Sequence, residues 1–108
     1  MKILDINDNY ITKEEFLIYS GINLELELPK SDDEGNKANR YIHQVELFVL
    51  GQLNPYEKQE VNDLNIGYIK LAIVEQLVYS LSNTNDVLCE KAKNWLRKGG
   101  FMNIRRGV

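Results

Sequence analysis

Cysteine is nearly absent from this 108-residue sequence, which contains only Cys89. A single cysteine cannot form an internal disulfide, and a cysteine-based zinc site needs several thiolates. The lack of disulfides fits a reducing, intracellular setting. No apolar run of about 18 residues occurs, so we expect no membrane-spanning helix. Residues 1–9 also lack the long apolar run of a secretory signal.

Histidine is equally scarce, and His43 is the only one. The positions one helical turn away on either side hold Asn39 and Leu47, so only Glu46 offers a nearby acid. One histidine and one glutamate do not make a metal site. We therefore expect His43 to be solvent-facing or hydrogen-bonded. Cys89 has no histidine close in the chain to act as its base, so we expect a partly buried, inert thiol.

Motifs that carry catalysis or bind nucleotides are missing as well. The sequence has no glycine-rich phosphate loop, no dinucleotide fingerprint and no nucleophile elbow. The acids at Glu14–Glu15 and Asp32–Glu34 lie at expected helix starts, where carboxylates favour the positive end of the helix dipole. The sequence therefore predicts a protein that is not an enzyme and that has no metal and no cofactor.

The sequence does contain enough apolar residues for a core, and an uneven distribution of charge. Hydrophobic residues make up 44% and charged residues 27% of the chain, which is ordinary for one folded domain. Residues 87–108 hold six basic residues and one acidic residue, a net charge of +5. Residues 1–86 hold 7 basic and 15 acidic residues, a net of −8. Oppositely charged ends can attract copies head to tail, and ordinary variation in surface charge is the alternative.

The first helix is predicted at residues 13–20. Thr12 and Glu15 form a capping box, in which each side chain accepts a hydrogen bond from the other residue's backbone N–H. Gly21 is suited to end the helix because glycine adopts the left-handed conformation at little cost. Residues 23–28 alternate leucine with glutamate, and this period of two predicts an extended linker.

Three longer helices are predicted downstream. The first follows a Ser31–Glu34 capping box and has apolar residues at spacings of three and four. Those residues are Ala38, Tyr41, Ile42, Val45, Phe48, Val49 and Leu53. The second, at residues 66–81, is apolar on several faces, so it is predicted to be the buried centre or to meet a partner as well. The third covers residues 87–98, begins at an Asn85 or Asp86 cap and ends at a glycine pair.

Together these elements predict an all-α fold, a small bundle of about four helices. Residues 1–10 are expected to form a loosely ordered N-terminal arm, and residues 11–98 the helical domain. Residues 99–108 are expected to form a C-terminal tail. This single-domain organisation matches the length of the chain.

The C-terminal tail and the end of the last helix combine apolar side chains with basic ones. This mixture is enriched at protein interfaces, so we predict that the segment binds a partner protein. A frayed terminus is the alternative. The predicted interface residues are Arg97, Lys98, Phe101, Met102, Ile104, Arg105 and Arg106.

The order and size of these helices resemble the small head–tail connector proteins of tailed phages, also called adaptor or head-completion proteins. The resemblance covers Tyr10–Val108 and is carried by Ile11–Phe16 (ITKEEF), Tyr41–Glu46 (YIHQVE), Ile69–Gln76 (IKLAIVEQ) and the final basic helix. It depends on helix order and size more than on fixed residues. The acidic segment Asn23–Glu34 has no clear counterpart in the family.

The resemblance implies an all-α virion protein that self-associates as a homo-oligomeric ring of about twelve copies. Such a ring docks on the portal protein of the capsid, extends the DNA channel and offers a surface to the next tail-side connector or stopper protein. It also implies assembly in the host cytoplasm, no membrane, and DNA only as the contents of the channel. The C-terminal segment of the family commonly contacts the portal, which assigns residues 99–108 to portal binding.

The alternative from another class is a small helical DNA-binding protein, such as a terminase small subunit or a repressor module. The helix at residues 13–20 followed by Gly21 loosely matches the start of a helix-turn-helix. However, the next segment is acidic, and phosphate contacts require clustered Lys and Arg. Only residues 87–108 supply such a cluster.

Overall fold

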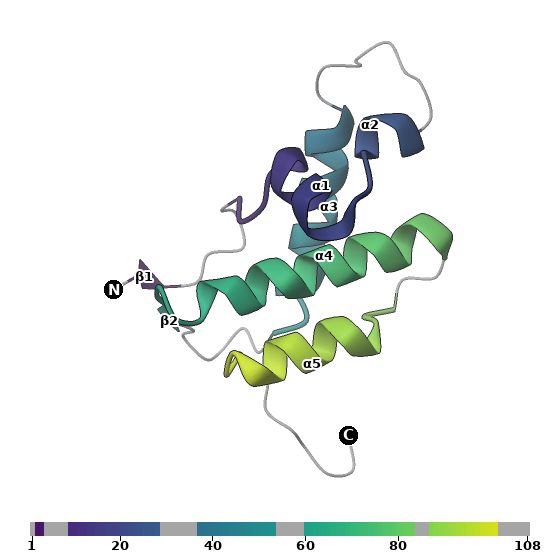
Figure 1. Cartoon of the computed structure of the whole chain (residues 1–108). Helices are drawn as coiled ribbons and strands as arrows, with labels where there is room; N and C mark the ends of the chain where they lie inside the picture. The colour runs from purple at the N-terminus through teal and green to yellow at the C-terminus, as the bar shows by residue number, and fades with distance from the viewer. Residues whose placement is uncertain (1, 4–8, 29–36, 54–59, 84–86, 102–108) are drawn as a thin grey trace.

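The computed structural model describes residues 2–3, 9–28, 37–53, 60–83 and 87–101, which form five helices and one short pair of strands (Figure 1). The helices are α1 (Lys13–Ser20), α2 (Leu24–Glu27), α3 (Lys37–Leu50), α4 (Ile66–Ser82) and α5 (Glu90–Lys98). The strands β1 (Lys2–Ile3) and β2 (Glu60–Val61) pair antiparallel. The predicted all-α fold class is confirmed.

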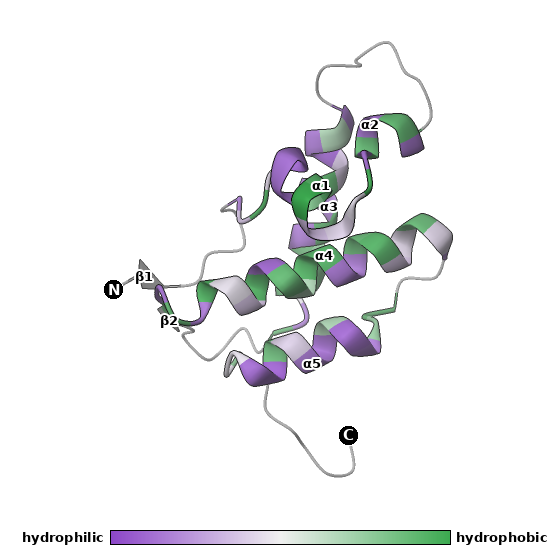
Figure 2. Cartoon of the chain, viewed as in Figure 1, coloured by the Kyte–Doolittle hydropathy of each residue, from purple (hydrophilic) through white to green (hydrophobic). Residues whose placement is uncertain are grey.

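α4 is the centre of the molecule because its apolar residues face in several directions. Figure 1 shows α1 and α2 above α4, and α5 below it. Ile69, Ile73 and Leu77 of α4 are completely buried, as are Ala92 and Leu96 of α5. The rest of α5 is largely hydrophilic, in contrast to α4 (Figure 2). The predicted buried central helix is therefore confirmed, and α5 covers it with one narrow apolar stripe.

α1 begins and ends where its sequence predicts. The backbone N–H of Glu15 donates to Thr12 Oγ1 at 3.1 Å, and the backbone N–H of Thr12 donates to Glu15 Oε1 at 3.1 Å. Gly21 ends the helix with a φ of 76°, a left-handed conformation that other residues adopt at a cost. The capping box and the glycine stop are both confirmed.

The glutamate of this capping box also joins α1 to α4. Lys70 Nζ lies 2.7 Å from Glu15 Oε2. The hydrogen bond from Lys70 lowers the pKa of Glu15 below its usual 4.5, and the hydrogen bonds with Thr12 lower it further. A carboxyl whose pKa is lower in the folded state contributes stability above its unfolded pKa, and that contribution is lost as the pH falls through the folded pKa.

Replacing Lys70 with methionine should therefore remove a pH-dependent part of the stability. Because both side chains are partly exposed to water, we expect a loss of about 0.5–1 kcal/mol at pH 7. The gap between wild type and the variant should narrow as the pH falls below 4.5. Urea unfolding between pH 7 and pH 2.5 measures this. A gap that is constant over that range contradicts the ion pair. Glu15→Gln should lose the same pH-dependent part of the stability as the Lys70 variant.

The segment predicted as an extended linker contains a helix instead. α2 covers Leu24–Glu27, and the side chain of Asn23 caps it by accepting from the Glu25 backbone N–H at 3.0 Å. The alternation of leucine also places Leu24 and Leu28 one helical turn apart, so the pattern fits both conformations. The cap and the burial of Leu24 favour the helix, and the prediction of an extended linker is wrong.

α3 buries the predicted stripe and, within it, a charged residue. Ala38, Ile42, Val45 and Val49 are all buried, as the spacing predicts. Glu46 is also completely buried. The Ser31–Glu34 capping box predicted for this helix lies outside the described residues.

The buried Glu46 carboxylate ties the N-terminal segment to α3. Its Oε2 accepts from the backbone N–H groups of Tyr10 at 2.7 Å and Ile11 at 2.9 Å. Tyr10 and Ile11 are themselves buried, and Lys2 pairs opposite Val61. The described parts of residues 1–10 are thus joined to the helical body, contrary to the expectation of a loosely ordered arm.

α5 begins three residues later than predicted because a side chain of α4 holds the preceding segment extended. Gln76 donates through Nε2 to the Val87 carbonyl at 2.9 Å, and its Oε1 accepts from the Cys89 backbone N–H at 2.8 Å. These two bonds resemble the pairing of neighbouring strands. The helix starts at Glu90, and the predicted caps Asn85 and Asp86 lie outside the described residues.

The helical body continues beyond the predicted boundary at residue 99. The Phe101 backbone N–H donates to the Leu96 carbonyl at 2.9 Å, and the Phe101 side chain is buried in the core. A Cβ atom at Gly99 would lie 2.8 Å from the Tyr68 Cβ and 2.9 Å from the Phe101 ring, so only glycine fits between them. Gly100 then turns the chain with a φ of 81°. Phe101 is therefore part of the domain rather than part of a tail.

Candidate functional site

Three consecutive large apolar side chains on α1 lie in water. Leu17, Ile18 and Tyr19 are 44%, 80% and 49% exposed, whereas Phe16 beside them is completely buried. Successive residues of a helix are about 100° apart, so Phe16 faces the core and Ile18 points almost directly away from it. We call Leu17, Ile18 and Tyr19 the α1 surface. Exposed apolar side chains grouped in this way mark interaction sites.

The sequence contains a signal for the α1 surface that is neither a catalytic nor a basic motif. Phe16 to Tyr19 are four consecutive large apolar residues in a helix of eight residues. A short helix buries one face, so a continuous run of four cannot all be buried. The capping box predicts the helix, and the run inside it indicates which of its faces stays exposed.

The predicted C-terminal interface residues divide into three groups. Arg97 and Lys98 lie in the last turn of α5. Arg97 Nη1 donates to Asn94 Oδ1 at 3.1 Å, and Lys98 Nζ lies 4.8 Å from the centroid of the Trp95 ring. Phe101 is 3% exposed and packs in the core, so its side chain offers little surface to a partner. The remaining predicted residues, Met102, Ile104, Arg105 and Arg106, lie outside the described residues.

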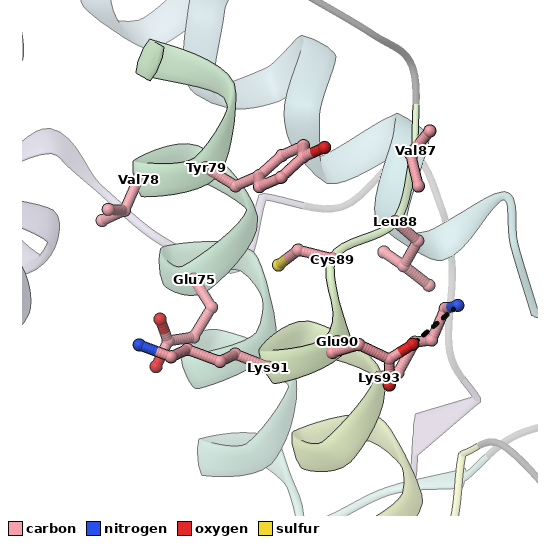
Figure 3. Close-up of a pocket in the computed structure, with 9 residues that line it drawn as sticks. All are labelled: Glu75, Val78, Tyr79, Val87, Leu88, Cys89, Glu90, Lys91 and Lys93. Atoms are coloured by element: carbon pink, nitrogen blue, oxygen red, sulfur yellow. Dashed lines mark hydrogen bonds and ion pairs between the residues drawn. The ribbon is translucent and has the colours of Figure 1, made fainter. Parts of the chain in front are cut away.

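A pocket opens between the C-terminal half of α4 and the start of α5. It has a volume of about 470 Å³, within the range of about 300–1,000 Å³ of binding pockets in proteins. Figure 3 shows Val78 and Tyr79 contributed by α4, and Val87, Leu88 and Cys89 contributed by the extended segment before α5. Glu75 and Lys91 lie on the same side of it (Figure 3). We call this the α4–α5 pocket. Its wall is largely apolar, with charged groups beside it.

No family model, curated protein or solved structure matches this chain. The geometry of the chain's own residues therefore carries the functional argument. That geometry consists of the α1 surface, the α4–α5 pocket and the basic last turn of α5.

The single histidine has a local partner, and the single cysteine lies at the wall of the α4–α5 pocket. His43 Nδ1 lies 3.2 Å from Glu46 Oε1, and because a carboxylate can only accept, the histidine donates. The prediction of a hydrogen-bonded histidine is confirmed. Cys89 is half-buried at the wall of the α4–α5 pocket, as expected of a partly buried thiol.

Among the residues that the structure describes, no three His, Cys, Asp or Glu side chains gather closely enough to hold a metal ion. Within the same ranges, none of the helices has the length and apolar character to cross a bilayer.

Proposed function

We propose that the protein is a structural adaptor that binds other proteins, and specifically a head–tail connector of a tailed phage. The observation that supports this best is the α1 surface. Phe16 is the one residue of α1 that is buried, and the apolar side chains of Leu17, Ile18 and Tyr19 remain exposed to water. Such a group of side chains stabilises a complex when a partner covers it.

A connector needs two docking regions, and this chain offers two on different sides of α4. α1 lies above α4 and α5 lies below it (Figure 1). We assign the α1 surface to the next tail-side connector or stopper protein. We assign the end of α5 and the residues after Phe101 to the portal protein, because Arg97, Lys98, Arg105 and Arg106 concentrate positive charge there. DNA is then only the contents of the channel.

A truncation that ends at Phe101 tests the portal assignment. The cut is placed there because a cut at Gly99 would also remove Phe101 from the core. We expect the truncated protein to keep its unfolding midpoint and to lose at least about tenfold in portal affinity. Sedimentation of the protein with a purified portal ring measures this. A folded truncation that sediments with the portal as wild type does would overturn the assignment.

A DNA-binding protein is the alternative, and α5 is the observation that favours it. Lys91 and Lys98 are exposed on this helix, and clustered cations bind phosphates. The same sedimentation experiment separates the two functions. Failure to associate with the portal, combined with salt-dependent retardation of duplex DNA, would replace the connector proposal with this one. Absence of duplex binding at low salt would remove the alternative.

A further inference from the structure

α5 ends in a Schellman motif, a C-terminal cap in which one left-handed residue turns the chain back onto the last turn of the helix. The backbone N–H of Phe101 donates to the Leu96 carbonyl at 2.9 Å, and that of Gly100 donates to the Arg97 carbonyl at 3.1 Å. These two bonds define the motif. Gly100 is its left-handed residue, with a φ of 81°.

Apolar contacts hold the motif in place. Leu96 is completely buried and Phe101 is 3% exposed, and both belong to the core. The Phe101 ring can approach the end of α5 because Gly99 has no side chain. A Cβ atom at Gly99 would lie 2.9 Å from the ring and 2.8 Å from the Tyr68 Cβ. Phe101 is therefore fixed relative to α5 by two backbone bonds and by its own burial.

Positive charge lies on both sides of this motif in the sequence. Arg97 and Lys98 lie in the last turn of α5, and Arg105 and Arg106 follow a few residues later. No acidic residue occurs from residue 91 to residue 108. The direction in which the chain leaves α5 therefore decides whether one partner surface can bind both pairs of cations.

We propose that Gly100 is a positioning residue for portal binding. Through the Schellman motif it directs the segment that carries Arg105 and Arg106 toward the same portal surface that Arg97 and Lys98 contact. A segment that leaves a helix in a fixed direction loses less conformational freedom on binding than one that leaves a frayed end, so it binds more tightly. The inference deepens the proposed function and rests on it, because that function assigns this segment to the portal.

Gly100 can be replaced without a steric clash. Apart from its neighbours in the chain, no atom of the described residues lies within 4 Å of an added Cβ. The effect of a substitution is therefore conformational. Gly100→Val opposes a positive φ because valine is β-branched, whereas Gly100→Asn tolerates it. Faster exchange of the Phe101 amide in the valine variant, relative to amides of α4, would show that the motif has opened.

Binding to a purified portal ring, measured by sedimentation, tests the proposal. In the protein that retains residues 102–108, Gly100→Val should lower the affinity by about fivefold. Gly100→Asn should stay within about twofold of wild type, because the left-handed conformation is kept. In the truncation that ends at Phe101, Gly100→Val should not change the remaining affinity, because the segment to be positioned is absent. All variants are compared at a temperature at which circular dichroism shows them folded.

Gly21→Val is the matched control. Gly21 has a φ of 76° and an equally open Cβ position at the end of α1, so valine introduces the same backbone strain far from α5. Its portal affinity should equal that of wild type. An equal loss in this control would overturn the proposal, because the strain would then act through general stability. An equal loss from Gly100→Val with and without residues 102–108 would overturn it too.

The outcomes separate this inference from the connector function. A wild type that binds the portal, combined with a Gly100→Val variant that binds equally well, would overturn the positioning role alone. A wild type that does not sediment with the portal would overturn the connector function and, with it, the portal as the partner of this segment. A loss restricted to Gly100→Val in the protein that retains residues 102–108 would support both.

Discussion

Glu46→Ala is expected to lower the free energy of unfolding by about 3–5 kcal/mol. The carboxylate is completely buried and accepts from the backbone N–H groups of Tyr10 and Ile11. Alanine leaves both donors buried without an acceptor, and each unsatisfied group costs about 1–3 kcal/mol. It also removes the partner of His43 Nδ1. Urea unfolding followed by circular dichroism measures the loss.

Glu46→Gln is the control for this effect. Its amide oxygen can still accept from Tyr10 and Ile11, and its NH₂ group can donate to the other tautomer of His43. We expect a loss of about 1–2 kcal/mol, because bonds to a charged acceptor become bonds to a neutral one. Equal losses in the two variants would mean that the charge matters and the geometry does not. A loss below about 1 kcal/mol for alanine would contradict the role of Glu46 as an anchor.

The second large effect is expected at Gln76. Replacing it with leucine keeps most of the side-chain volume and removes both bonds to the extended segment, to the Val87 carbonyl and from the Cys89 N–H. We expect a loss of about 2–3 kcal/mol, because the backbone groups of a half-buried segment lose their partners.

Amide hydrogen exchange gives the sharper measurement for Gln76→Leu. The Cys89 amide should exchange at least about tenfold faster relative to amides of α3, because the segment before α5 opens locally. Gln44→Leu is the control, since Gln44 is exposed on α3, and it should change neither stability nor exchange. Unchanged protection at Cys89 in the Gln76 variant would show that something other than these two bonds holds the segment.

The elements that could be predicted from the sequence are those fixed by neighbouring residues. The capping box of Thr12 and Glu15, the glycine at position 21 and the apolar character of α4 involve contacts within a few positions. The expected all-α fold depends on these local signals, and it is confirmed. Local patterns also have a limit, as α2 shows. Leu24, Leu26 and Leu28 alternate as in a strand, but Leu24 and Leu28 also lie one helical turn apart.

The features that could not be predicted depend on partners far along the chain. Glu46 lies one turn after Ile42 and one turn before Leu50, on the apolar stripe of α3, and its partners are 35 and 36 positions away. Gln76 lies among the buried residues of α4 and determines where α5 starts. Each polar residue interrupts an apolar stripe, which marks it as buried, but its partners follow only from the tertiary structure.

Of the candidate interaction surfaces, the α1 surface has a local signal in the sequence and the α4–α5 pocket has none. The run from Phe16 to Tyr19 could have identified the α1 surface, because a short helix cannot bury four consecutive large side chains. The α4–α5 pocket could not be found, since its walls come from two helices and an extended segment. The arginines near Phe101 in the sequence suggest an interface, whereas its ring packs beside Gly99 and Tyr68.

The burial of Phe101 sets how far the chain beyond it can extend. Phe101 is held by the core and by its bond to the Leu96 carbonyl, so every later residue is tethered at that point. A fully extended chain spans at most about 3.6 Å per residue, which limits Arg106 to about 18 Å from Phe101. A partner that binds Arg105 and Arg106 must therefore come close to the end of α5. Arg97 and Lys98, which lie in the last turn of α5, are then within reach of the same partner.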